Sequence, residues 1–380
     1  MKRLLCLIAM LALTAAWGAA YAAEQESAPA TTGASAPAAA QAPAPKAPNQ
    51  PPTYFVPTLP AELSLCGTRV PLERRMVAEQ LERELIIVVH DPAQVIMWLK
   101  RAWRYFPYIE GRLKAKGMPQ DIKYLAVAES SLIHYIRSPA GAVGPWQFMA
   151  ATGRKYGLRI NRWYDDRRNV ALATQAALSY LSDLHQEFDS WPLAMAAYNC
   201  GENRVAREIK EQATKDYFDL SLPRETQRYI YRILAAKLVI SDPQSYGYVL
   251  PPEARWEPMA GQSVTLTLKK PVHLTVVAQA AGTSYRMLRE LNPELRRRYL
   301  PKGRVTVVVP PGHGQDLAAR LQKMQPATSP QNEVYVVRRG DSLGAIARRH
   351  GVSLNEIKDA NDLEGDCVIV PGQRLNIPEK

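Results

Sequence analysis

Apolar side chains between residues 63 and 245 recur every three or four positions, and this stretch shows no alternating strand pattern. A helix is predicted to begin at Asp91 and Pro92, because an N-cap aspartate followed by proline suits a first helical turn. Its apolar face holds Val95, Leu99, Ala102, Trp103 and Phe106. The pattern predicts a compact, mostly α-helical domain.

Prolines and glycines mark where the next helices begin and end. Gly117 and Pro119 interrupt the chain before a short predicted helix over 120–128, which leads directly into Glu129. Glu129 therefore follows an apolar run, YLAVA, that would keep water away from its carboxyl group. Such burial raises a carboxyl pKa and suits a general acid. A capping or ion-paired glutamate is the alternative.

A long helix is predicted over 169–188, with Asp165 or Asp166 as its cap. Two more helices are expected to begin at Pro192 and Pro223. The long helix has an apolar stripe at 4,3,4,3,4 spacing, formed by Val170, Thr174, Ala177, Leu181, Leu184 and Phe188.

The final third of the chain contains an internal repeat. Each copy has a β-branched run, two short helical segments and an apolar strand, so we expect two small βααβ units over 262–312 and 333–378, joined by a linker at 313–332. In the second copy the outer strands are expected at 334–337 and 374–377. The matching positions are Leu274, Ala278, Gly282, Ser284, Leu288 and Asn292 in the first copy and Leu343, Ala347, Gly351, Ser353, Ile357 and Asn361 in the second.

The first residues are typical of a secretory signal peptide. Lys2 and Arg3 are followed by an apolar run over 4–17, which is too short for a mature anchor, and a small-x-small site ends at Ala22. Cys6 has no small residue before it, so a lipid anchor is not supported. We expect cleavage near Ala22 and a periplasmic protein that can associate with the wall; an uncleaved anchor is the alternative.

Composition adds a tether and a basic region. Residues 23–60 are rich in Ala and Pro and are expected to act as a linker. The net charge is +12, and residues 260–310 hold nine Lys and Arg against two Glu. In an exported protein this charge favours an acidic polymer or the wall as partner over nucleic acid, and solubility alone is the alternative.

Cysteine and histidine usage argues against a disulfide framework or a structural zinc site. Removal of the signal peptide leaves an odd number of cysteines, Cys66, Cys200 and Cys367, in three different contexts. The sequence has no CxxC and no clustered His/Cys spacing. No metal is therefore expected.

Four separated motifs carry a family resemblance, in this order: Glu129-Ser130, the pair SPAGAVG and GPWQFM, AAYNCGENRV, and LPRETQRYI. They resemble the soluble lytic transglycosylase family, which is related to goose-type lysozyme. The resemblance covers about 119–240, and the arrangement of flanking modules is most similar to the membrane-bound D group. It implies a lysozyme-like helical catalytic domain over 119–258, preceded by a helical extension over 61–118.

The resemblance also implies roles for individual residues. Glu129 matches the catalytic acid and base, and Ser130 matches the residue that orients it. Gln147, Tyr198 and Asn199 match residues that line the sugar cleft, and Tyr229 matches the tyrosine that approaches the catalytic carboxyl. One departure is Pro145, which stands where the family usually has leucine and removes a backbone donor from the cleft loop.

The repeat resembles LysM, a module that binds glycans containing N-acetylglucosamine. The second copy carries YVVRRGDSL and VPGQRLNIP and matches well. The first copy has KKPVHL in place of RRGDSL and is divergent, so its glycan binding is left open. Alone, such modules would indicate a binding protein and not an enzyme.

The family chemistry implied is cleavage of peptidoglycan between N-acetylmuramic acid and N-acetylglucosamine, with 1,6-anhydromuramic acid ends and no cofactor. It needs a single carboxyl, whereas ordinary glycosidases use two. The nearest other carboxyls in sequence are Asp165, Asp166 and Glu202, which are explained as caps or surface charges. A hydrolytic muramidase on the same fold and a catalytically silent wall-binding scaffold are the alternatives.

Overall fold

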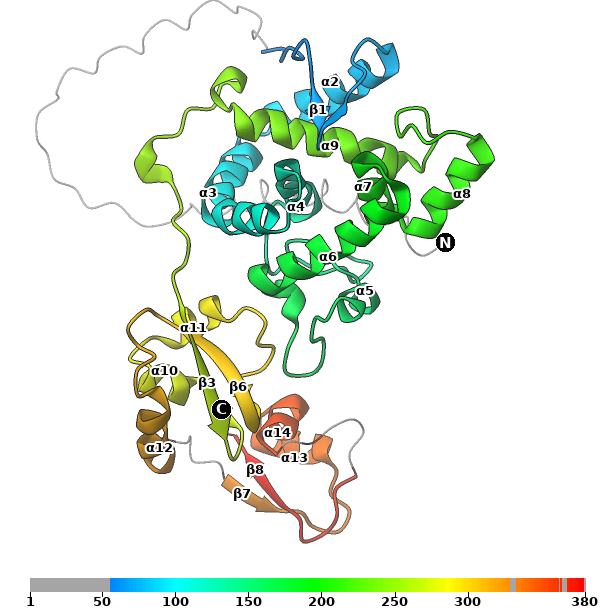
Figure 1. The fold of residues 1–380 in the computed structure, drawn as a ribbon. Coiled ribbons are helices and arrows are strands. Elements are labelled where there is room, and N and C mark those ends of the chain that lie inside the picture. Colours follow the sequence, from blue (N-terminus) through cyan, green and yellow to red (C-terminus); the bar gives the residue numbers. More distant parts are fainter. Residues whose placement is uncertain (1–54, 329–332, 362, 364–367, 379–380) are drawn as a thin grey trace, which may run out of the picture.

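The computed structural model describes residues 55–328, 333–361, 363 and 368–378, and it is rich in helices (Figure 1). A helical domain occupies the first part, and two small α+β modules lie below it in the view of Figure 1. The predicted signal peptide and most of the tether, as far as residue 54, lie outside the described residues. Within the described part, no helix has both the length and the apolar character needed to cross a membrane.

The helical domain begins with a two-stranded hairpin and continues through helices only. Its elements in chain order are β1 (Ser64–Leu65), β2 (Thr68–Arg69), α2 (Arg75–Val89), α3 (Pro92–Ala115), the 3-10 turn Gln120–Ile122, α4 (Lys123–Ser130), α5 (Ala150–Lys155), the 3-10 turn Asp166–Arg168, α6 (Val170–Phe188), α7 (Trp191–Cys200), α8 (Glu202–Gln212) and α9 (Arg224–Ser241). Short 3-10 turns at Gln244–Tyr246 and Pro252–Ala254 then lead to the modules.

The helix starts follow the sequence signals, with one correction. Asp91 caps α3, and its carboxylate accepts a hydrogen bond from the Gln94 N–H at 3.0 Å. The cap of α6 is Asn169, whose side chain accepts from the Leu172 N–H, so the expected caps Asp165 and Asp166 are wrong. Both aspartates are instead buried in ion pairs with arginines.

The small strands were missed in the sequence pattern. The hairpin formed by β1 and β2 has two residues in each strand, which is too short for an alternation to be visible. Its turn is made by Cys66 and Gly67, both at positive φ. Cys66 and Cys200 are free thiols, while Cys367 lies outside the described residues.

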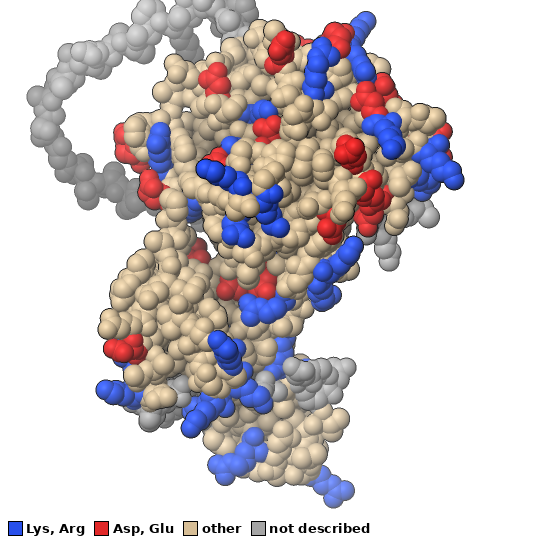
Figure 2. Space-filling model, in the orientation of Figure 1, with Lys and Arg blue, Asp and Glu red and all other residues tan. Residues whose placement is uncertain are grey.

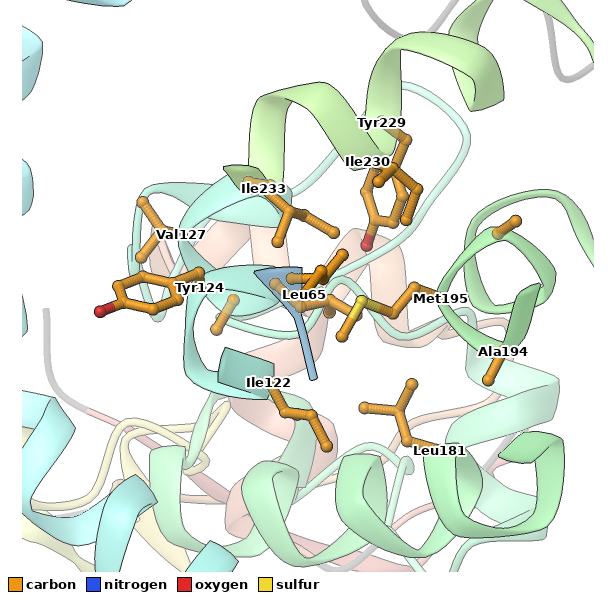
Figure 3. Close-up of a cluster of buried hydrophobic side chains, with 14 of the residues drawn as sticks. Leu65, Ile122, Tyr124, Val127, Leu181, Ala194, Met195, Tyr229, Ile230 and Ile233 are labelled. Atoms are coloured by element: carbon orange, nitrogen blue, oxygen red, sulfur yellow. The ribbon is translucent and has the colours of Figure 1, made fainter. Parts of the chain in front are cut away.

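The main core of the helical domain is an apolar cluster to which α3, α4, α6, α7 and α9 contribute (Figure 1), and a smaller cluster lies between α2, α3 and α9. Ile122, Leu125, Leu181 and Ile233 are fully buried in the main core. Figure 3 shows Met195 of α7 and Ile230 and Tyr229 of α9 directed into this cluster. This burial fixes α4, the helix that carries Glu129, chiefly against α9 and also against α3.

The two modules confirm the predicted repeat. The first comprises β3 (Gln262–Leu268), β4 (Val272–His273), α10 (Leu274–Ala280), α11 (Tyr285–Leu291), β5 (Tyr299–Leu300) and β6 (Gly303–Val309). The second comprises β7 (Glu333–Val336), α13 (Leu343–His350), α14 (Leu354–Ala360) and β8 (Arg374–Ile377). Strands β3 and β6 pair antiparallel, as do β7 and β8, so each copy contains the βααβ order, to which the first adds the short inner pair β4 and β5.

The segment expected to be a linker contains a helix, α12 (Leu317–Thr328), so that expectation is wrong for most of its length. Leu317 and Leu321, four positions apart, are buried against the first module. Arg320 donates to the Ala280 carbonyl of α10 at 2.7 Å. The helix forms because its apolar stripe, continued by Met324, has a surface to cover, and that stripe was the signal the sequence offered.

The first module is docked onto the helical domain by the segment before α6. The Asp165 N–H donates to the Glu294 carbonyl at 2.8 Å, and the Arg296 N–H donates to the Trp163 carbonyl at 2.9 Å. Trp163 and Tyr164 are buried within the core of the module. Through these backbone hydrogen bonds and shared core side chains, the first module packs directly against the helical domain and is not a separate unit.

The second module reaches the same junction through fewer contacts. Arg298 of the first module lies 3.3 Å from Glu356 of the second, and Ala360 packs in the core of the first. Arg162 of the helical domain donates to the Leu363 carbonyl. On the face drawn in Figure 2, Lys and Arg predominate over the modules, in keeping with the basic composition of residues 260–310.

Candidate active site

Helix α4 ends one residue after Glu129, the residue that the motifs single out. Its C-cap, Ser131, and the next residue, Leu132, both have positive φ, which turns the chain sharply away directly after Glu129. Arg232 of α9 donates to the Ala128 carbonyl at 2.9 Å and holds this end of the helix. The main chain around Glu129 is therefore fixed by the tertiary packing of α9 and not by α4 alone.

Tyr229 is the direct partner of Glu129. Its hydroxyl donates to Glu129 Oε1 at 2.5 Å, and its ring is 2% exposed. Burial raises the pKa of Glu129 to about 7, while the Tyr229 hydrogen bond and the charge of Arg232 pull it down and the charge of Glu225 adds to the rise. A carboxyl that is half protonated near neutral pH can both give and take a proton.

A loop over 138–148 lies beside Glu129 and is tied to its helix by Ser130. The Ser130 side chain is buried, and its hydroxyl lies 2.8 Å from the Pro145 carbonyl and 3.2 Å from the Ala126 carbonyl. The resemblance implies that Ser130 orients Glu129, and the hydrogen bonds that this hydroxyl makes in the structure tie the loop to α4. Pro145 needs no backbone donor here, because its carbonyl makes the contact.

Gln147 lies at the tip of this loop in a left-handed conformation, with φ of 46°. Its side-chain amide donates to the Gly144 carbonyl at 2.8 Å and is only partly buried. A positive φ at a residue other than glycine costs about 1–3 kcal/mol and is common where surrounding contacts impose it. The loop therefore holds Gln147 in place by its own backbone.

Tyr198 and Asn199 lie at the end of α7 and complete the surroundings. The Tyr198 hydroxyl donates to the Trp146 carbonyl at 2.7 Å, which binds α7 to the loop. Burial and then the charge of Glu129 raise the pKa of Tyr198 well above its usual value. Asn199 accepts a hydrogen bond from the Thr226 hydroxyl at 2.9 Å and thus faces α9.

The other acidic candidates are engaged elsewhere. Asp165 is 4% exposed and its oxygens accept from Arg167 at 2.8 and 2.9 Å, so it is not a surface charge as expected. Burial would raise the pKa of Asp165, but Arg167 holds it below its usual range. Asp166 is likewise buried against Arg159, and Glu202 accepts from the Tyr180 hydroxyl at 3.2 Å.

Sequence reasoning missed two charged residues that act on Glu129, namely Glu225 and Arg232 of α9. They lie four positions before and three after Tyr229, so a single helical face carries all three toward α4. The motif LPRETQRYI already contained Glu225, and its helical spacing from Tyr229 was the available signal.

Comparison with known proteins assigns each part of the chain to a domain. Residues 107–221 match the transglycosylase SLT domain, 262–326 match the LysM-like domain of the lytic transglycosylase MltD, and 335–378 match the LysM domain. The second match includes most of α12 and agrees with the packing of that helix on the first module.

Relatives in other organisms are similar to parts of this chain. The chain is 35% identical over 293 residues to the membrane-bound lytic murein transglycosylase D of Escherichia coli K12, covering 73% of this chain and 64% of that protein. It is 31% identical to a putative tributyltin chloride resistance protein of Alteromonas, over 40% of this chain and 75% of that one. The peptidoglycan transglycosylase gp16 of phage T7 is 35% identical over 32% of this chain and 9% of its own length.

Among solved structures, the lytic transglycosylase Slt of Pseudomonas aeruginosa, in an inactive mutant form, matches with a TM-score of 0.27 and 18% identity, over 50% of this chain and 27% of that one. A TM-score this low does not establish a shared fold. The evidence for the family comes from the domain matches and the relatives, which confirm the family that the four motifs predict. The chain belongs to the transglycosylase SLT family and carries an MltD-type LysM-like domain and a LysM domain after its lysozyme-like helical domain.

Proposed function

We propose that this protein is a lytic transglycosylase that cleaves peptidoglycan between N-acetylmuramic acid and N-acetylglucosamine. The observation that carries the proposal is the Glu129 carboxyl, with a pKa of about 7 and a hydrogen bond from Tyr229. The match to lytic murein transglycosylase D supports the substrate. The chain spans 64% of the length of that relative, so its activity is proposed here on the strength of the site.

The chemistry uses Glu129 twice. Its acid form protonates the bridging oxygen, and the bond from that oxygen to the anomeric carbon of the muramic acid breaks. The 6-hydroxyl of the same sugar then forms a bond to this carbon, and Glu129 takes the hydroxyl proton back. Since Tyr229 donates to Oε1, the second oxygen is left to exchange the proton with substrate.

Tyr198, Asn199 and Gln147 would line the sugar cleft, and Ser130 would keep the cleft loop on α4. No second carboxyl is needed, because the attacking hydroxyl is tethered beside the reacting carbon. That fits a site where Asp165 and Asp166 are already neutralised by arginines.

The LysM domain would hold the enzyme on wall glycan. We further propose that the protein is exported and acts in the periplasm, on the strength of the predicted signal peptide and of a relative described as membrane-bound. N-terminal sequencing of the protein from periplasmic fractions should find a chain that starts near residue 23.

The product of cleavage tests the activity directly. Purified sacculi digested with the protein should release fragments with 1,6-anhydro ends, which borohydride does not reduce and which have gained no water. Glu129→Gln, which nearly preserves size but removes the transferable proton, should lower turnover by about 10²–10⁴-fold. It should remain folded and still bind sacculi.

Reducible ends that have gained water would contradict the proposal and favour the muramidase. In that case Glu225 becomes the first candidate for the second carboxylate, because its charge acts on Glu129 whereas Asp165 and Asp166 are bound by arginines. Near-normal turnover in Glu129→Gln would overturn the assignment of the site.

A further inference from the structure

The chain turns sharply after Glu129, and two consecutive residues of this turn have an unfavourable backbone conformation. Ser131 and Leu132 have φ of 55° and 59°, in the left-handed region that residues with a Cβ seldom adopt. Such a conformation persists only where surrounding contacts impose it. Because Ser131 is the C-cap of α4, two positions after Glu129, the contacts that hold this turn also help to set where Glu129 lies.

The contacts that hold the turn come from one face of α3. The Gln94 side-chain amide donates to the Ser131 hydroxyl, and Arg101 donates to the Ser131 carbonyl at 3.2 Å. The Tyr105 hydroxyl lies 3.5 Å from His134 Nδ1, three positions further along the turn. Gln94, Arg101 and Tyr105 are seven and then four positions apart, so they lie along one face of the helix. Helix α3 therefore binds both the side chain and the main chain of Ser131.

The main chain of Glu129 is thus held on two sides. Arg232 of α9 donates to the Ala128 carbonyl, one residue before Glu129. Gln94 and Arg101 of α3 act two residues after it, at Ser131. Hydrogen bonds on both sides restrict how far the carboxyl can move without disturbing the packing of α3 or α9.

The α3 contacts come from outside the matched catalytic domain. The SLT match covers 107–221, whereas Gln94 and Arg101 lie in the part of α3 that precedes it. We infer that this preceding part completes the site, and that Gln94 and Arg101 are positioning residues that fix the turn at Ser131 and thereby hold the Glu129 carboxyl in place for proton transfer. The proton transfer itself rests on the proposed function. Misplacing a reacting group by about 1 Å can cost about 10²-fold in rate, so a small movement at this turn would be measurable.

Kinetics of the full-length chain on soluble glycan fragments test the positioning role. Gln94→Ala and Arg101→Ala should each lower kcat about tenfold and leave KM unchanged, because the residues that line the cleft are untouched. Arg101→Lys can still donate to the Ser131 carbonyl and should retain most of the rate that Arg101→Ala loses. Lys100→Ala is the matched control, since it removes a bond from the same helix to the Ala254 carbonyl, at 2.6 Å, and should keep kcat.

Ser131→Gly separates positioning from stability. Glycine adopts a positive φ without strain, so this variant should fold with an unchanged or higher melting temperature. It lacks the hydroxyl that Gln94 binds, and kcat should therefore still fall. Adding Gln94→Ala to Ser131→Gly should lower kcat no further, since both changes break the same hydrogen bond. Full additivity of the two changes, or a normal kcat in Ser131→Gly, would overturn the inference.

Titration of Glu129 by NMR, in protein with labelled carboxyl groups, needs no turnover. The signal is assigned by its loss in Glu129→Gln, and the wild-type pKa should be about 7. Gln94 is uncharged, so Gln94→Ala acts on this pKa only through position, and a looser turn that admits water should lower it. The titratable and charged groups coupled to Glu129 stay in place in this variant: Tyr229, Arg232 and Glu225 of α9 and Tyr198 of α7.

An unchanged Glu129 pKa in Gln94→Ala would contradict the positioning role, as would the same shift in the control Lys100→Ala. Absence of turnover in the wild-type chain would sink the proposed function but leave this titration intact. The two failures are therefore distinguishable.

Discussion

At the scale of single residues, the chemistry depends on the pairing of Glu129 with Tyr229. Burial alone would push the carboxyl pKa upward, and the tyrosine hydroxyl with Arg232 limits the rise. The pair spans 100 positions of sequence and joins α4 to α9. Its geometry therefore depends on how these two helices pack and not on either segment alone.

Tyr229→Phe keeps the ring in its pocket and removes the hydrogen bond to Glu129. Because this bond lowers the Glu129 pKa, its loss should raise the pKa, and the acid form should persist to higher pH. The alkaline limb of the pH profile of kcat/KM, near 7 in the wild type, should move upward while the maximum falls. Tyr248→Phe, whose hydroxyl contacts the Val89 carbonyl far from the site, is the control. A limb that stays in place with a normal maximum would remove Tyr229 from the mechanism.

At the scale of elements, the cleft loop is held between α4, α7 and the segment before α6. Ser130 reaches it from α4, Tyr198 from α7, and Arg167 donates to the Gly141 and Phe148 carbonyls at 3.1 and 3.0 Å. Arg167 in turn is bound to Asp165, whose N–H meets the first module. The loop is therefore coupled by direct contacts to the docked module.

Gly144 tests how tightly this loop is packed. Its φ is +85°, and a Cβ there would lie 1.8 Å from the Arg167 carbonyl oxygen. Gly144→Ala should lower the free energy of unfolding by more than the roughly 1–3 kcal/mol of backbone strain, and should reduce turnover with it. Gly141→Ala shares a positive φ but has open space, so it isolates the strain. Urea unfolding with equal losses for both variants would contradict the close packing.

At the scale of the whole molecule, the two modules differ in how they are attached. The first shares core side chains and backbone hydrogen bonds with the helical domain, while the second has its own core, which includes Ile346, Ile357 and Leu375. The first module is thus structurally continuous with the helical domain, and the second module is the better candidate for a separable wall-binding module.

Deletion of residues 333–380 should weaken the pelleting of the protein with sacculi and leave turnover of soluble glycan fragments largely intact. The physical reason is that the second module contributes only a few contacts, such as Arg298 with Glu356, to the rest of the chain. Cosedimentation and a soluble-fragment assay on the same preparations measure both. Equal loss in the two assays would mean that the module supports the catalytic fold.

Much of the fold could be predicted because helix caps, prolines and apolar stripes are local signals. Asp91, Pro192 and Pro223 mark helix starts as expected, and the repeat predicted both βααβ modules. The failures have physical causes. Helix α12 was missed because its apolar stripe lies in a segment whose flanking residues resemble a linker. The cap of α6 was misplaced because Asp165 and Asp166 form buried ion pairs with arginines.

By itself the sequence determined the order of domains, the helical character of the first one and the prominence of Glu129, because motifs and periodicity are written along the chain. Only the tertiary structure decided the partners of Glu129, the anchoring role of Ser130's hydrogen bonds and the docking of the first module through Glu294. These depend on which side chains meet across long separations. Local sequence patterns do not show which distant side chains come into contact, because those contacts depend on how the helices pack.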